Sequence, residues 1–175
     1  MKLGCYKLYE DLILPTFGTK QSACFDIYSY LPNNELLTAY TIQNEKIKIP
    51  CCSYEEDKET KYFEIFPGIR ALIPTGLIFN IPKGHSIRIH ARSGLAFKEG
   101  LVLANSEGII DQDYIDPCYI MLTNISTERI KIKHGQRIAQ GELVKTLDYS
   151  IEVCYTKPFI EGSTRIGGFG STGLT

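Results

Sequence analysis

The chain lacks an excess of charge of either sign and has no long apolar run. Its 175 residues include 19 basic and 20 acidic side chains, a formal net charge of −1. We therefore expect no bulk electrostatic attraction toward nucleic acid or an anionic membrane. No run of about 18 apolar residues is present, so no membrane-spanning helix is expected. If the protein handles anions, a local site must bind them.

The cysteines do not have the spacing of a metal site or of a disulfide framework. They stand at positions 5, 24, 51, 52, 118 and 154, and no Cys-x-x-Cys pair occurs. The adjacent Cys51 and Cys52 are poorly placed for a disulfide. We therefore expect reduced thiols, a cytoplasmic location and no zinc. Residues 1–15 have too many charges and too short an apolar stretch for a signal peptide.

The hydrophobic pattern predicts short β-strands. The segment 70–92 alternates or clusters β-branched residues between prolines and glycines. Further on, Ile130 and Ile132 alternate with basic side chains, which is the period of a half-buried strand. The other predicted strands lie at 118–126, 129–135 and 143–149.

The length and this pattern favour one all-β domain, a barrel or a sandwich. A long amphipathic helix is absent from the pattern. The sequence predicts a short helix only at residues 92–100, with Ser93 as the N-cap and Gly100 as the C-terminal stop. The segment 33–64 contains the charged run EEDKETK, and we expect it to form a surface excursion with a hairpin around EKIKIPCC.

Two stretches in the middle of the chain carry unusual polar chemistry. ARSGLA, at 91–96, combines a guanidinium, a hydroxyl and free backbone N–H groups at a helix start. That pattern suits an anion, and it also suits an ordinary capped helix. In NSEGIIDQDY, at 105–114, Asp111 could hold and activate a water, or simply end a hairpin strand.

Two stretches nearer the end have the same ambiguity. GQRIAQGE, at 135–142, is polar enough for a binding site and equally typical of a strand edge with ion pairs. The terminal RIGGFGSTGLT, at 165–175, has glycine N–H groups and two hydroxyls that could wrap an anion. A glycine-rich end is also typical of a frayed terminus.

Taken together and in order, these stretches resemble the five motifs of the homotrimeric dUTPases. SACFDIYS (22–29) is similar to the first motif, ARSGLA to the second and NSEGIIDQDY to the third. RIAQ (137–140) is similar to the fourth and GGFGSTG (167–173) to the fifth. Each motif is weak alone, but five in order at compatible spacing are specific. The resemblance covers nearly the whole chain except about 33–64.

The resemblance implies a fold, an assembly and a reaction. The fold would be an all-β, distorted jelly-roll-like β-barrel over 1–164, with a mobile C-terminal lid at 165–175. Three chains would form a ring with active sites shared between subunits. The reaction would be hydrolysis of dUTP to dUMP and pyrophosphate, with Mg²⁺ as cofactor. This activity keeps uracil out of DNA and supplies dUMP for thymidylate synthesis.

The family's roles can be carried over to matching positions. Asp111 matches the catalytic aspartate that activates the attacking water, and Asp26 matches the first-motif aspartate, which would contact Mg²⁺ through a water. Tyr114 matches the residue that packs against deoxyribose. The positions that match substrate-binding residues are Arg92, Ser93, Gly94, Asn105, Gly108, Ile109, Ile110, Tyr119, Gln140, Arg165, Phe169, Gly170, Ser171 and Thr172.

Three positions depart from the family pattern. Ala91 replaces a proline before the second motif, and Asp116 replaces a glycine at the end of the third. Arg165 stands two residues before GGFG, whereas the family's arginine stands three before it. These departures concern the rigidity of two turns and the reach of the terminal arginine.

Two other functions fit parts of the pattern. A dCTP deaminase would usually carry Arg-Ser-Ser and a catalytic glutamate where this chain has Arg92-Ser93-Gly94 and Asp111. A protein-interaction regulator on the same scaffold could signal through residues 33–64. The intact set of motifs makes dUTP hydrolysis the primary prediction.

Overall fold

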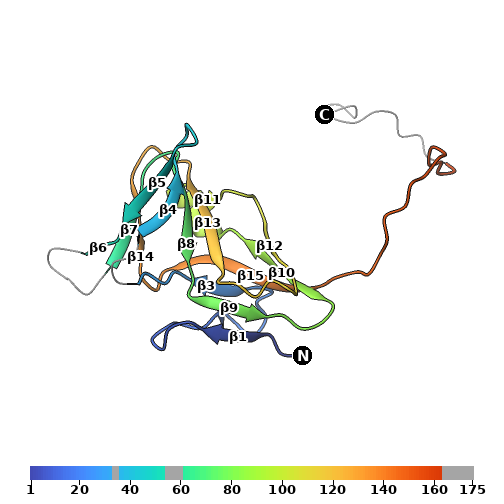
Figure 1. The fold of residues 1–175 in the computed structure, drawn as a ribbon, viewed down its shortest axis with the longest axis horizontal. Coiled ribbons are helices and arrows are strands. Elements are labelled where there is room, and N and C mark those ends of the chain that lie inside the picture. The colour runs from blue at the N-terminus through green and yellow to red at the C-terminus, as the bar shows by residue number, and fades with distance from the viewer. Residues whose placement is uncertain (33–35, 54–60, 163–175) are drawn as a thin grey trace.

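The computed structural model describes residues 1–32, 36–53 and 61–162, and they form a β-structure with one short helix (Figure 1). No helix among these residues is long and apolar enough to cross a membrane. The strands are β1 (Gly4–Lys7), β2 (Thr16–Phe17), β3 (Phe25–Tyr28), β4 (Leu36–Tyr40), β5 (Lys46–Pro50), β6 (Cys52–Ser53), β7 (Lys61–Ile65), β8 (Arg70–Pro74), β9 (Leu77–Asn80), β10 (His85–His90), β11 (Leu101–Leu103), β12 (Gly108–Ile110), β13 (Tyr119–Asn124), β14 (Ile130–Lys133) and β15 (Arg137–Lys145), and the helix is α1 (Ser93–Glu99).

The described strands form two larger and two smaller sheets. One five-stranded sheet has the order β12-β10-β15-β3-β2, and the other has the order β11-β13-β8-β4-β5. A three-stranded sheet, β14-β7-β6, and the pair β1-β9 complete the fold. The predicted all-β, jelly-roll-like class is confirmed, although the described sheets do not close into a barrel.

One hydrophobic core joins the sheets. Ile27 and Ile87 from the first large sheet and Ile73 and Ile120 from the second are fully buried in one cluster. In β8 and β13 buried and more exposed positions largely alternate, because successive side chains point to opposite faces, whereas in β3 both faces are covered. Burial of one such side chain stabilises the fold by roughly 1.5–3 kcal/mol.

Most of the predicted strands are present. The segment 70–92 forms β8, β9 and β10, and β13 and β14 lie where strands were predicted. The strand predicted at 143–149 is displaced, because β15 ends at Lys145 and already includes the fourth motif. Its register is set by pairing with β10 on one side and β3 on the other, which the local pattern of residues does not encode.

The short helix was predicted at the right place with the wrong cap. Arg92 is the N-cap residue, its side chain makes no capping hydrogen bond, and Ser93 is the first helical residue. Gly100 ends the helix in the left-handed conformation, at φ 70°, as predicted. A Cβ there would lie 3.0 Å from Ser126 Cβ, so both space and backbone favour glycine.

The segment 33–64 is not a surface excursion in its described parts. β4 and β5 form a hairpin, and β4 also pairs with β8 inside a large sheet. β7 pairs with β14, which places Phe63 opposite Ile132, and both side chains are fully buried. The charged run suggested an exposed loop, but the alternating apolar positions on either side of it belong to the core.

This finding predicts a large stability loss for Phe63→Ala. Removing a fully buried ring costs about 3–5 kcal/mol of unfolding free energy, measurable by urea denaturation. Phe97→Ala is the matched control, because Phe97 is 91% exposed, and it should change the stability by less than about 0.5 kcal/mol. Equal small effects of both variants would contradict a core role for β7.

Candidate active site

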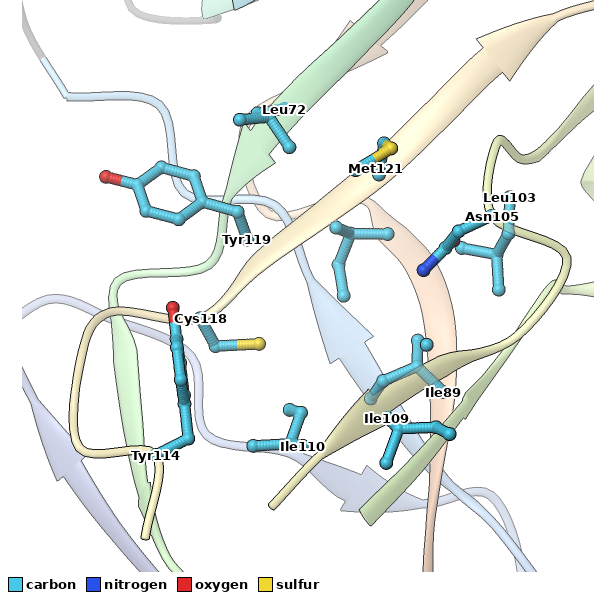
Figure 2. Close-up of a pocket in the computed structure, with 12 residues that line it drawn as sticks. Leu72, Ile89, Leu103, Asn105, Ile109, Ile110, Tyr114, Cys118, Tyr119 and Met121 are labelled. Atoms are coloured by element: carbon cyan, nitrogen blue, oxygen red, sulfur yellow. The ribbon is translucent and has the colours of Figure 1, made fainter.

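A pocket of about 230 Å³ opens between β12 and β13 (Figure 2). This volume is below the range of about 300–1,000 Å³ that is usual for drug-sized ligands, so the pocket suits a base with part of a sugar. Leu72, Ile89, Leu103 and Met121 contribute apolar walls. The lining also includes the predicted residues Asn105, Gly108, Ile109, Ile110, Tyr114 and Tyr119.

Strand β12 is the edge of its sheet. It pairs with β10 on one side only, with Gly108 opposite Ile89 and Ile110 opposite Ile87. The N–H and C=O groups on its other side therefore have no ladder partner among the described strands. A Cβ at Gly108 would lie 3.0 Å from Ile89 Cβ, so glycine permits the close approach of these strands. The pocket thus has a wall of alternating backbone donors and acceptors.

The loop after β12 carries Asp111 and places Tyr114 in the pocket lining. Asp111 directly follows Ile110, is exposed, and its C=O accepts a 3.2 Å hydrogen bond from the Tyr114 N–H. The Gln112 side chain accepts a 2.9 Å hydrogen bond from the Gly84 N–H and so ties this loop to the turn before β10. Tyr114 donates its hydroxyl to the Pro117 carbonyl at 3.1 Å. The tyrosine ring is therefore held in place beside the pocket (Figure 2).

Cys118 contributes a neutral thiol to the pocket wall. The side chain is buried, and burial raises the pKa of this thiol to about 12, against a smaller lowering by Thr75. Burial also raises the pKa of Tyr114, with smaller contributions from Cys118, Asp116 and Tyr119. Both groups are therefore uncharged at neutral pH, and the pocket interior presents no anion to an incoming ligand.

A second cluster centres on the buried carboxylate of Asp26, in β3. Arg137 donates a 3.1 Å hydrogen bond to Asp26 Oδ2, and Arg92 Nε lies 3.2 Å from Oδ1. The Arg92 N–H is not aligned with that oxygen, so Oδ1 accepts no hydrogen bond within the described residues. Arg92 also donates to the Arg137 carbonyl at 3.2 Å. One carboxylate thus orients two guanidinium groups, an arrangement with a net positive charge that suits an anion.

Strand register brings Gln140 into this cluster. Gln140, in the middle of β15, lies opposite Asp26 in β3 and opposite His90 in β10. Successive strand residues point to opposite faces, so these three side chains share one face. Ile89 and Gly108, which line the pocket, belong to the other face. Of the pocket residues in this sheet, Ile89, Gly108 and Ile110 therefore lie on the face opposite the arginine cluster, whereas Ile109, paired with Arg88 at the sheet edge, lies on the same face as the cluster.

The predicted second-motif residues lie at the edge of the arginine cluster. Arg92 belongs to it, and Ser93 and Gly94 follow at the start of α1, exposed. A Cβ at Gly94 would meet no atom within 4 Å, so the fold itself does not require this glycine. Arg165, Phe169, Gly170, Ser171 and Thr172 lie outside the described residues.

Several residues with a part in these sites were not among the predicted site residues. Arg137 shares Asp26 with Arg92, and the pocket is also lined by Leu72, Ile89, Leu103, Cys118, Ile120 and Met121. The motif RIAQ contains Arg137, so its charge was a usable signal. No local signal marked Cys118 or Met121, because only the packing of β12 against β13 makes them part of a pocket.

The Asp26 cluster fits Mg²⁺ only through a water. Asp26 is one carboxylate between two guanidinium groups, so direct coordination would set the cation against two like charges. Its unpartnered Oδ1 can accept a hydrogen bond from a metal-bound water. Mg²⁺ commonly keeps several waters and is bound with substrate phosphates, which agrees with this arrangement.

Comparisons with known proteins agree with the fold and the motifs. A family model described as dUTPase matches residues 58–173. The deoxyuridine 5'-triphosphate nucleotidohydrolase of Nautilia profundicola is 34% identical over 173 residues, 99% of each chain. The protein of that name from Brucella melitensis is 40% identical over 115 residues, 66% of this chain and 72% of its own.

Solved structures show the same fold at lower identity. A dUTPase from Streptococcus mutans has a TM-score of 0.62 at 23% identity, covering 84% of this chain and 98% of its own. A variant dUTPase of Staphylococcus bacteriophage 80alpha, solved with dUpNHpp, has a TM-score of 0.68 at 21% identity, covering 99% of each chain.

The fold and the two sites thus define an all-β protein with a pocket of about 230 Å³ and a cluster of two arginines around a buried aspartate. The family-model match and the relatives, one of which matches over nearly the full length, make the class specific. The chain belongs to the dUTPase family.

The burial of the pocket thiol predicts a difference in reactivity between two cysteines. With a pKa raised to about 12 by burial, Cys118 stays protonated, and a thiol is a poor nucleophile. At pH 9, iodoacetamide should modify the exposed Cys154 and leave Cys118 unmodified in the folded protein, as judged by peptide mass spectrometry. Denaturant should abolish the difference. Equal labelling of both cysteines in the folded protein would contradict the burial of this wall.

Proposed function

We propose that the protein hydrolyses dUTP to dUMP and pyrophosphate, with a water activated by Asp111 attacking the α-phosphorus. The observation that carries the proposal is the position of Asp111 directly after the edge strand that forms the base-sized pocket. A carboxylate at that place can hold a water and accept its proton. The names of the relatives support the same reaction.

Uracil fits the wall formed by β12. Its ring presents an N–H between two carbonyl groups, and an exposed strand edge offers complementary carbonyl and N–H groups. Asn105 adds an amide that can both donate and accept. Cytosine presents an amino group and a bare nitrogen at the corresponding positions and would leave buried groups unpaired. Such mismatches discriminate by roughly 10⁴-fold.

Tyr114 would distinguish deoxyribose from ribose. Its ring is fixed by the hydroxyl contact to Pro117 and lies at the pocket mouth, where the sugar of a bound base would emerge. An apolar ring against the 2′ carbon leaves neither space nor a partner for a 2′-hydroxyl. Tyr119, on the opposite wall, would contribute backbone contacts.

The triphosphate would bind at the Asp26 cluster. Arg92 supplies charge, the free N–H groups of Ser93 and Gly94 face solvent at the helix start, and Gln140 adds an amide. Mg²⁺, bound by phosphate oxygens and waters, neutralises phosphate charge. Asp26 would hold one of those waters with its free oxygen.

The active site requires more than one chain. Most pocket residues of the sheet lie on the face opposite the arginine cluster, so one nucleotide would contact the pocket of one subunit and the arginines of another. A ring of three chains would create three such shared sites, in keeping with the preference of proteins for closed symmetry.

The segment after β15 supports the same assembly. It leaves the body as an extended arm (Figure 1). Apolar and polar residues alternate along it, as in a half-buried strand, and the apolar ones are largely exposed, Ile151 at 92% and Tyr155 at 95%. Such a strand gains stability by pairing with another subunit. The lid at 165–175 would follow the arm to a neighbouring active site, where Phe169 would cover the base and Arg165, Gly170, Ser171 and Thr172 would enclose the phosphates.

A product assay against dUTP, dCTP, dTTP and UTP tests the function. We expect Mg²⁺-dependent release of pyrophosphate from dUTP and at least about 10³-fold lower kcat/KM for the other nucleotides. Asp111→Asn should retain nucleotide binding and lose at least about 10²-fold in kcat, since it can no longer accept the proton.

Asp113→Asn is the control for that variant, because Asp113 is exposed in the same loop. It should keep nearly full activity. Ammonia release from dCTP would indicate a deaminase, and an absence of dUTP hydrolysis would refute the proposal.

The assembly predicts a change of mass when the apolar face of the arm is made polar. Ile151→Asp combined with Tyr155→Asp should convert a three-chain particle into smaller species in light scattering coupled to size-exclusion chromatography, and should lower kcat. Glu152→Ala, which changes the polar face of the arm, should leave the mass unchanged. A three-chain mass for the double variant would contradict a role of the arm in assembly.

A further inference from the structure

Cys24, His90 and Glu142 form a cluster outside the residues assigned to the nucleotide. One ligand atom from each, a sulfur, a ring nitrogen and a carboxylate oxygen, lies within 4.8 Å of the other two. His90 Nε2 is 3.4 Å from Glu142 Oε2. All three side chains are half-buried, so the cluster is formed by the fold and still reachable from solvent.

The register of three strands brings these residues together. Gly141 of β15 lies opposite Phe25 of β3, so the next residue, Glu142, falls beside Cys24. Gln140 lies opposite His90 of β10. Glu142 is two positions beyond Gln140 in β15, so Glu142 and His90 lie on the same face of the sheet. Cys24 is two residues from Asp26, and Glu142 is two residues from Gln140. The cluster therefore lies next to the Asp26 cluster on the same face of the sheet.

The other ring nitrogen of His90 faces a fourth residue. Its Nδ1 lies 3.8 Å from Glu107 Oε1, and Glu107 is itself held by Arg88, whose NH1 is 3.2 Å from Oε2. A carboxylate behind a histidine fixes the ring orientation and makes the remaining nitrogen a better ligand. His90 therefore has Nε2 toward Glu142 and Nδ1 on the side of Glu107.

We propose that Cys24, His90 and Glu142 form a binding site for a thiophilic divalent cation of the Zn²⁺ class. A sulfur, an imidazole and a carboxylate are the ligands Zn²⁺ takes, whereas Mg²⁺ prefers oxygen alone. Bonds of about 2.0–2.3 Å in a tetrahedral site separate ligand atoms by roughly 3.3–3.8 Å. The three atoms need to close by about 1 Å, which side-chain rotation can supply.

A bound divalent cation would stabilise the thiolate of Cys24 and neutralise the charge of Glu142. Three protein ligands leave a fourth position for a water. We expected no zinc because the chain has no Cys-x-x-Cys spacing, but such a spacing is not needed when the ligands come from separate segments, here β10, β15 and the residue before β3.

Spectroscopic titration with Co²⁺ tests the site in the full-length protein. With Mg²⁺ in excess to occupy any nucleotide-linked position, one equivalent of Co²⁺ per chain should produce a sulfur-to-cobalt charge-transfer band and intense visible bands typical of a tetrahedral ion. Zn²⁺ should displace it. Equilibrium dialysis with metal analysis should give one Zn²⁺ per chain.

Variants separate this site from adventitious binding. Cys24→Ser should abolish the charge-transfer band, His90→Gln and Glu142→Gln should each weaken Zn²⁺ binding at least about tenfold, and Glu107→Gln about tenfold. Cys154→Ser and His85→Gln are the matched controls, because Cys154 and His85 lie outside the cluster, and they should bind as the unaltered chain does. Circular dichroism checks that each variant is folded.

Two results would overturn the proposal. One is the absence of a charge-transfer band at saturating Co²⁺, and the other is unchanged Zn²⁺ affinity in Cys24→Ser. Either would leave His90 and Glu142 as a surface ion pair with an uninvolved cysteine beside it. Because the readout is metal uptake, it does not depend on the proposed hydrolysis of dUTP.

Discussion

The pairing of β15 with β10 on one side and β3 on the other is the constraint on which both candidate sites depend. It requires Gly141, because a Cβ there would lie 2.5 Å from the Phe25 ring. The close packing that results fixes the register across three strands. A shift by one residue would move every side chain to the opposite face, bury the charged residues and expose the core isoleucines.

This register also explains why the proposed active site must be shared. One face of the sheet supplies apolar residues to the core and the base pocket, and the other presents Asp26 with its two arginines. The fold forms each half within one chain, and the proposed assembly would bring the halves of different chains together. Catalysis would then depend on assembly. The proposed metal ligands Cys24, His90 and Glu142 lie on the same face as Asp26, so metal binding would depend on the same strand register.

The sequence was informative where a residue's role is local. The alternation of Ile130 and Ile132 predicted β14, and several residues that the motifs singled out line one pocket. It failed where the outcome depends on long-range pairing. The charged run near Lys58 suggested a surface excursion, but β4 and β7 on either side of it pair with β8 and β14. The start of β15 was placed too late because its neighbours set its ends. The meeting of Cys24 with Glu142 likewise follows from a register that no short motif contains.

The most direct test of the account is hydrolysis of dUTP in ¹⁸O-labelled water by the unaltered protein with Mg²⁺. If a water beside Asp111 attacks the α-phosphorus, one labelled oxygen enters dUMP and the pyrophosphate remains unlabelled, as mass spectrometry of both products would detect. Label in the pyrophosphate would place the attack on the β-phosphorus. That result would contradict the proposed alignment of the base pocket, Asp111 and the arginine cluster.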